Sequence, residues 1–133
     1  MGAWGMGVFD DDTSCDLLYD AMDTDAGTFI AKAVGHKDSD YLEYDDCHEV
    51  IVSGAILDSL LVGTKYSHET EGYDDWLSKQ DKSALSKYKE DIVSGLNLVL
   101  SDKSELNELW QENEEDYPTW KSNIEGIIAN LRS

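Results

Sequence analysis

Apolar side chains recur along most of this sequence at spacings of three and four residues, which is the period of an amphipathic helix. The clearest case lies near the C-terminus, where these apolar residues share one helical face: Trp120, Ile124, Ile127, Ile128 and Leu131. Pro118 suits the first turn of that helix, because a backbone N–H there would have no helical partner. Alternating runs of β-branched residues, which are typical of strands, are scarce. The pattern therefore predicts an all-α fold.

The same spacing predicts the other helices. In chain order they are a helix through 17–22, a short helix at 29–34, a long helix over 41–62, a short element around Trp76 and Leu77, a helix over 85–99, and one that begins at Ser101 or Ser104. Asp12 or Thr13 can cap the first, while Gly35 and Gly63 follow the second and third, where glycine favours a helix end. We expect one bundle of about six or seven helices that forms a single domain over residues 1–133.

The first nine residues differ from the rest, because glycines alternate there with bulky apolar side chains. Gly2, Gly5 and Gly7 have a spacing similar to that of a phosphate-binding loop. However, no strand precedes them, no lysine follows, and residues 10–12 are all Asp, which would repel a phosphate. We interpret this segment as a Gly/Trp-rich N-terminal arm that packs against the helical core.

The net charge of the chain excludes some classes of binding partner. The chain of 133 residues has 29 acidic and 10 basic side chains, which gives a formal net charge of −19. This charge repels phosphate backbones and anionic lipids, so we expect no direct contact with nucleic acid or membrane. No stretch approaches the ~20 apolar residues of a membrane helix, and no secretory signal is visible. Because Cys15 and Cys47 do not make a disulfide framework, we expect a cytoplasmic protein with reduced thiols.

Residues suited to catalysis are poorly arranged in this sequence. Cys47 and His48 are adjacent, but neighbours on a helix do not face each other, and Cys47 belongs to an apolar stripe. The other two histidines are too distant in sequence for a zinc-binding spacing. We expect a buried, inert thiol, no catalytic residue, no cofactor and no enzymatic activity. Asp58 interrupts the same stripe, and we interpret it as a buried carboxylate bonded to nearby N–H groups or to Lys65.

Acidic residues gather in two blocks that contain no Lys or Arg. The first block offers oxygen ligands at calcium-like spacing, from Asp10, Asp12, Asp16, Asp23 and Asp25. An EF-hand loop also requires glycine at its sixth position and glutamate at its twelfth, and counting from Asp10 or Asp23 supplies neither. We expect no metal site, and a metal-binding module or metal-dependent enzyme built on this block is an alternative function.

The second block, over residues 38–49, also contains two tyrosines three residues apart, which would share a face of the long predicted helix. Aromatic rings among carboxylates resemble an anchor with charges at its rim, an arrangement that engages a basic partner. The predicted partner-binding residues are Asp38, Asp40, Tyr41, Glu43, Tyr44, Asp45 and Asp46. A merely solvated acidic face is the other interpretation.

The opening sequence resembles that of a bacterial family of uncharacterised small domains, whose members begin Met-Gly-x-Trp-Gly-x-Gly-x-Phe-Asp-Asn-Asp. Here it reads Met1-Gly2-Ala3-Trp4-Gly5-Met6-Gly7-Val8-Phe9-Asp10-Asp11-Asp12, with Asp11 in place of the usual Asn. Ser104-Glu105-Leu106, followed by Leu109-Trp110 and by Trp120, is similar to a later motif of that family. The resemblance brings no established activity or binding residues, and by analogy it implies an immunity protein that neutralises a cognate toxin.

Charge and resemblance lead to the same expected function. We expect an immunity protein that binds a basic toxin domain, with a nuclease as the favoured type, through its acidic surface. Binding would occlude the surface that such a toxin uses for phosphates. A general acidic protein-interaction domain without a toxin is a further alternative.

Overall fold

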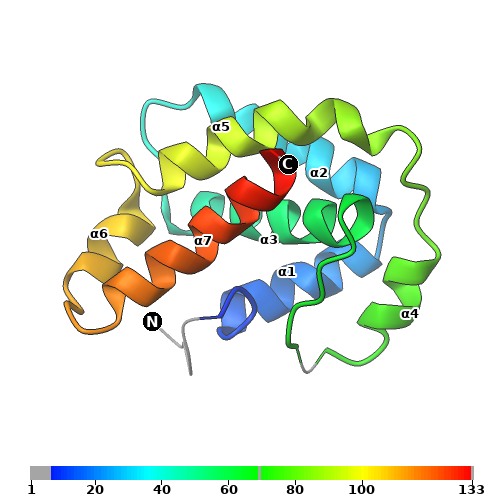
Figure 1. Ribbon diagram of the computed structural model, residues 1–133, viewed down its shortest axis with the longest axis horizontal. Helices are drawn as coiled ribbons and strands as arrows, with labels where there is room; N and C mark the ends of the chain where they lie inside the picture. The colour runs from blue at the N-terminus through cyan, green and yellow to red at the C-terminus, as the bar shows by residue number, and fades with distance from the viewer. Residues whose placement is uncertain (1–6, 69, 133) are drawn as a thin grey trace.

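The computed structural model describes residues 7–68 and 70–132, which form helices joined by short connections and one longer loop (Figure 1). The elements are α1 (Asp12–Met22), α2 (Ala26–Val34), the 3-10 helix η1 (Gly35–Asp38), α3 (Tyr44–Leu61), α4 (Tyr73–Ser78), the 3-10 helix η2 (Leu85–Tyr88), α5 (Lys89–Val99), α6 (Glu105–Gln111) and α7 (Tyr117–Arg132). This confirms the predicted all-α class. Residues 1–6 of the predicted Gly/Trp-rich arm, Trp4 among them, lie outside the described part.

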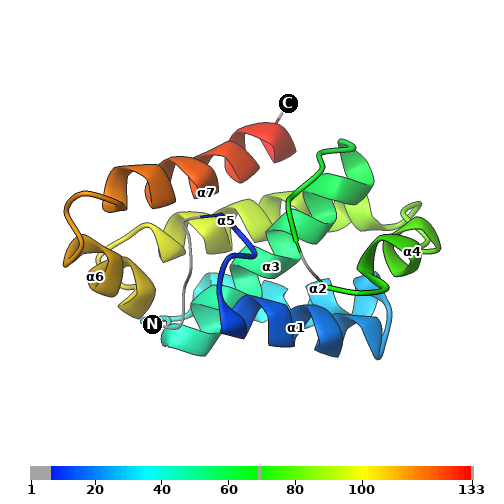
Figure 2. The same ribbon diagram turned by 90° about the horizontal axis from the view of Figure 1, so that it is seen from below.

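Helix α3 is the centre of the molecule. It packs against α1, α2, α5, α6 and α7, and Figure 2 shows α1 and α7 on opposite sides of it. The apolar stripe expected from the sequence is buried at Cys47, Val50, Ile51, Gly54 and Ala55. Val52, Ile56 and Leu57, on the rest of the helix, are buried too. A helix that is apolar on nearly all sides belongs in a core rather than at a surface. The single stripe predicted from the sequence therefore underestimates the burial of α3.

Gly54 allows α5 and α7 to approach α3 closely. A Cβ atom at this position would lie 3.1 Å from Leu96 Cδ1 and 3.3 Å from Ile127 Cγ2. Both neighbouring side chains are fully buried, so they have little room to move aside. Glycine is therefore needed at Gly54 for contact between helices and not for a turn.

The first residue of α3 differs from the prediction, because residues 41–43 are not helical. Leu42 instead forms an isolated backbone bridge with Ser104. The Leu42 N–H donates to the Lys103 carbonyl oxygen at 2.8 Å, and the Glu105 N–H donates to the Leu42 carbonyl oxygen at 2.9 Å. The chain at Leu42 is thus bound to the segment before α6 and cannot also form the first turn of α3.

Other helix ends were predicted with mixed success. Asp11, rather than Asp12 or Thr13, caps α1, and its Oδ1 accepts the Ser14 N–H at 2.7 Å. Ser104, one of two predicted candidates, caps α6. Gly35 does end α2, but a 3-10 helix continues through it to Asp38.

The C-terminal half follows the predicted pattern closely. The five apolar residues predicted to face inward from α7 are all buried. Trp120 stacks on Trp110 of α6, with ring centroids 5.7 Å apart. The helix predicted over 85–99 is present as η2 followed by α5. Across the described residues, no helix is both long and apolar enough to cross a lipid bilayer.

Candidate functional site

Tyr41 lies in the connection between η1 and α3, and its side chain is 44% exposed. Because α3 begins only at Tyr44, the two tyrosines do not share a helical face, and that part of the prediction is wrong. The bridge formed by Leu42 holds the backbone next to Tyr41, so the ring projects from a fixed segment rather than from a free loop.

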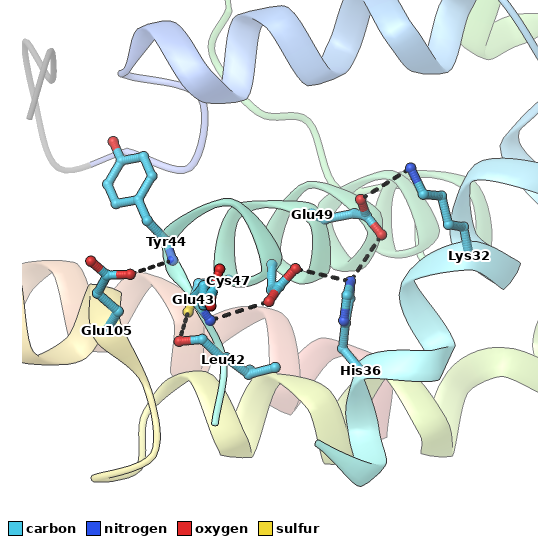
Figure 3. Close-up of polar contacts among 9 residues, drawn as sticks. Lys32, His36, Leu42, Glu43, Tyr44, Cys47, Glu49 and Glu105 are labelled. Atoms are coloured by element: carbon cyan, nitrogen blue, oxygen red, sulfur yellow. Dashed lines mark hydrogen bonds and ion pairs between the residues drawn. The ribbon is translucent and has the colours of Figure 1, made fainter. Parts of the chain in front are cut away.

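Tyr44 is half-buried and packs against the core. Its ring meets the His48 ring edge to face, with centroids 4.6 Å apart. Its backbone N–H donates to Glu105 Oε1 at 2.9 Å, as Figure 3 shows. The structure therefore gives Tyr44 a role in joining α3 to α6, and leaves Tyr41 as the exposed aromatic ring of the predicted site.

The predicted carboxylates divide into two groups. Asp38, Asp40, Glu43 and Asp45 are exposed. Asp46 is less exposed, and its Oδ2 accepts the Glu43 N–H at 3.2 Å in a capping box at the start of α3. This hydrogen bond stabilises the helix end, so Asp46 serves the fold as well as the surface.

Two side chains, one from α2 and one from η1, contact one edge of the block. His36 Nε2 lies 3.0 Å from Glu49 Oε1 and 3.8 Å from Asp46 Oδ1. Lys32 Nζ lies 3.6 Å from Glu49 Oε2 (Figure 3). The block itself lacks Lys and Arg, but the fold brings Lys32 of α2 and His36 of η1 to it. These contacts involve Asp46 and Glu49 and none of the other predicted carboxylates among the described residues.

Two carboxylates of α6 extend the site beyond the predicted residues. Partial burial raises the pKa of the Tyr41 hydroxyl, and the negative charges of Glu108 and Glu105 raise it further. Sequence reasoning missed both acids because they lie far along the chain from Tyr41. The following residues are called the Tyr41 surface below: Asp38, Asp40, Tyr41, Glu43, Asp45, Glu105 and Glu108.

The first acidic block does not converge on a point. Asp11 and Asp25 cap α1 and α2, and Asp10 Oδ2 accepts the Gly7 N–H at 3.0 Å. Asp12, Asp16 and Asp23 are exposed. In the part of the chain that the structure describes, no three His, Cys, Asp or Glu side chains are arranged to hold a metal ion. The geometry therefore gives no support to the metal-binding alternative.

A buried polar cluster, which the sequence did not reveal, joins the start of α1 to α3. Ser14 Oγ donates to Asp11 Oδ2 at 3.0 Å and lies 3.3 Å from His48 Nδ1. Desolvation by burial lowers the pKa of His48, against the opposing charges of Asp11 and Asp45. The serine lies between the other two groups and is fully buried, so it is not exposed as a nucleophile. This arrangement holds two helices together.

Both cysteines are free thiols, as predicted. Cys47 is fully buried, and its Sγ lies 3.3 Å from Ser104 Oγ and 3.7 Å from the Leu42 carbonyl oxygen. Burial raises the pKa of Cys47, which keeps the thiol protonated and unreactive. Cys15 is only partly buried, and burial raises its pKa as well.

Asp58 is fully buried in the last turns of α3, which confirms that part of its prediction. Of its two predicted kinds of partner, an N–H group is present and Lys65 is not. The carboxylate accepts hydrogen bonds from Asn130 Nδ2 at 3.0 Å, from Thr64 Oγ1 at 2.8 Å and from the Tyr66 hydroxyl. These donors come from the loop after α3 and from α7. A carboxylate so deeply buried requires such partners to offset the loss of water.

A family model described as a domain of unknown function, DUF4259, matches residues 2–123. The chain belongs to the DUF4259 family. In this DUF4259 chain the matched range contains the whole Tyr41 surface and all but the first residue of the opening sequence. Comparison with curated proteins gives no match. Comparison with solved structures gives none either.

Proposed function

We propose that this DUF4259 chain is an immunity protein that binds a basic toxin domain through the Tyr41 surface. The observation that carries the proposal is an exposed aromatic ring on a fixed segment, surrounded by carboxylates from two parts of the chain. A rigid aromatic side chain at the centre of a contact can supply much of its affinity. The surrounding charges then select a partner of opposite sign.

The charges near Tyr41 favour a cationic protein. The nearest preceding lysine, Lys37, is already paired, with Nζ 2.8 Å from Asp91 Oδ1. Within the described residues, no ion pair neutralises Asp38, Asp40, Glu43 or Asp45. Lys103 is exposed next to the bridge and is the cation that a partner would have to accommodate. A dense negative surface of this kind would increase the association rate of a basic partner.

A basic nuclease is the type of toxin that fits best. Such an enzyme holds nucleic acid through lysine and arginine side chains that contact phosphates. An acidic surface placed over those side chains blocks the substrate by occupying the same charges. Inhibition of this kind requires no catalytic group on the inhibitor. The net charge of −19 would also attract a basic toxin before contact is made.

The test uses the purified full chain and the protein encoded by the neighbouring gene, with binding followed by biolayer interferometry. Tyr41→Ala should weaken binding by roughly tenfold or more, as expected for a central aromatic anchor. Tyr19→Ala is the matched control, because Tyr19 is 51% exposed on α1, outside the Tyr41 surface. Equal affinities for Tyr41→Ala and Tyr19→Ala would contradict the proposal.

Charge steering is tested with a second pair of variants. Asp40→Asn with Asp45→Asn should lower the association rate several-fold and reduce its dependence on salt. Asp16→Asn with Asp20→Asn makes the same change of charge on α1 and should have the smaller effect. An association rate that does not change with salt would contradict electrostatic recognition. Binding without inhibition of a toxic activity would instead identify a general acidic interaction domain.

A further inference from the structure

A cleft of about 700 Å³ lies between the end of α3, the loop that follows it and α4, away from the Tyr41 surface. In Figure 1 this loop runs from the end of α3 past α1 to α4. Apolar side chains at the cleft include Leu60, Leu77 and Tyr73. Its volume lies within the range of small-molecule binding sites, which are roughly 300–1,000 Å³.

The described lining of this cleft has more basic than acidic side chains, in contrast to the molecule as a whole. Lys65 and Lys82 both line it, and neither takes part in an ion pair among the described residues. Asp74 is the one carboxylate in the described lining, and its Oδ1 accepts from His68 Nε2 at 2.8 Å. His68 Nδ1 in turn accepts the Thr70 N–H at 3.1 Å, which assigns the proton to Nε2. Two ammonium groups are thus left available in a chain with a net charge of −19.

The wall of the cleft is held in place from below. Thr64 and Tyr66 line the cleft and donate to the fully buried carboxylate of Asp58, which is not itself part of the lining. Asn130 of α7 donates to the same carboxylate. Side chains fixed in this way lose little freedom when a ligand binds, which is the condition for a preorganised site.

A buried hydroxyl at the cleft lacks a partner. Tyr73 is 2% exposed, lines the cleft, and has no hydrogen-bond partner for its hydroxyl within the described residues. Its ring is fixed by Phe9, at a centroid distance of 5.8 Å, and by Trp76, at 6.0 Å. The hydroxyl oxygen is itself closed off from solvent, so Tyr73 contributes its ring to the cleft wall and no hydrogen bond to a ligand.

We propose that this cleft binds a small organic carboxylate with an apolar body. Lys65 and Lys82 would bind the carboxylate, and Leu60, Leu77 and Tyr73 would contact the apolar part. This site is independent of the Tyr41 surface and of the proposed toxin partner, because it shares no residue with them. An anion without an apolar part would use the lysines alone and would bind more weakly.

The probe is 3-phenylpropanoate, titrated into the ¹⁵N-labelled full chain and followed by the backbone amide signals in NMR spectra. We expect saturable shifts concentrated at the loop 63–68 and at α4. The uncharged 3-phenylpropanamide and the smaller acetate should each bind about tenfold more weakly, because one lacks the charge and the other the apolar body. Equal binding of the amide, or shifts spread over the whole chain, would overturn the proposal.

The decisive variant is Lys65→Met with Lys82→Met, which removes both charges and keeps the length of the side chains. We expect it to weaken 3-phenylpropanoate binding about tenfold or more. The control is Lys79→Met with Lys103→Met, which makes the same change of charge at positions that do not line the cleft. Equal losses in the two double variants would show a general effect of charge and would overturn the site. Circular dichroism confirms that each variant is folded.

Discussion

The hydrogen bond from Tyr66 to Asp58 should stabilise the fold more than an ordinary tyrosine hydrogen bond does. Its acceptor is a fully buried carboxylate, and hydrogen bonds to charged groups contribute about 1.5–3 kcal/mol. Tyr117 offers a matched comparison, because it is also half-buried and donates to Asn107 Oδ1, a neutral acceptor, at 2.8 Å. A neutral hydrogen bond contributes about 0.5–1.5 kcal/mol.

Tyr66→Phe should therefore lower the free energy of unfolding by about 1.5–3 kcal/mol, and Tyr117→Phe by about 0.5–1.5 kcal/mol. Each variant loses one hydroxyl and keeps its ring, so the change in packing is nearly the same in the two variants. Asp58 retains Thr64 and Asn130 as donors, which places the expected loss below that of removing the carboxylate itself. The physical difference between the two variants is the charge of the acceptor.

Urea unfolding followed by circular dichroism at 222 nm measures both changes, because helices are the main secondary structure of the described residues. The slope of the transition should be the same in both variants and the wild type, since the surface exposed on unfolding does not change. A loss for Tyr66→Phe that is equal to or smaller than the loss for Tyr117→Phe would refute the reasoning. It would show that water replaces the lost donor at Asp58.

Three further predictions concern packing and charge. Gly54→Ala should lower the free energy of unfolding by about 1 kcal/mol or more in urea unfolding, because its Cβ would crowd Leu96 and Ile127. Gly126→Ala is the control, because a Cβ there meets nothing within 4 Å, and it should raise the free energy of unfolding by about 0.5–1 kcal/mol. Burial lowers the pKa of His48, so the unfolded chain takes up this proton more readily than the folded one. The wild type should therefore lose stability relative to His48→Asn as the pH falls below about 6.5. Equal dependence of the free energy of unfolding on pH in the two proteins would refute this. Because of the net charge of −19, sodium chloride should raise the melting temperature between about 10 and 300 mM, and a constant value would contradict self-repulsion.

Local patterns in the sequence were sufficient to predict most helices. A helix such as α7 buries one face, and the period of its apolar residues follows directly from that. Helix α3 was less predictable, because its start depends on the backbone bridge between Leu42 and Ser104. A contact between residues so far apart along the chain leaves no trace in the local pattern. Because of this contact, α3 starts at Tyr44 instead of at residue 41.

The candidate site was predicted in part for the same reason. The exposed ring of Tyr41 and its neighbouring acids could be found from their order in the sequence. The contacts of Lys32 and His36 with Glu49, and the addition of Glu108, arise only when helices pack together. The cleft beside α4 could not be predicted, because polar loop residues have no periodic pattern.

The end of α7 has a practical consequence for anyone who shortens the chain. The family model stops at residue 123, but α7 continues to Arg132. Ile127 and Leu131 lie in the core, and Asn130 donates to Asp58. A protein cut at the family boundary would lose the last turns of the helix that covers α3. Expression of this domain for crystallisation or display should therefore retain at least the residues up to Arg132, since the matched range ends before α7 does.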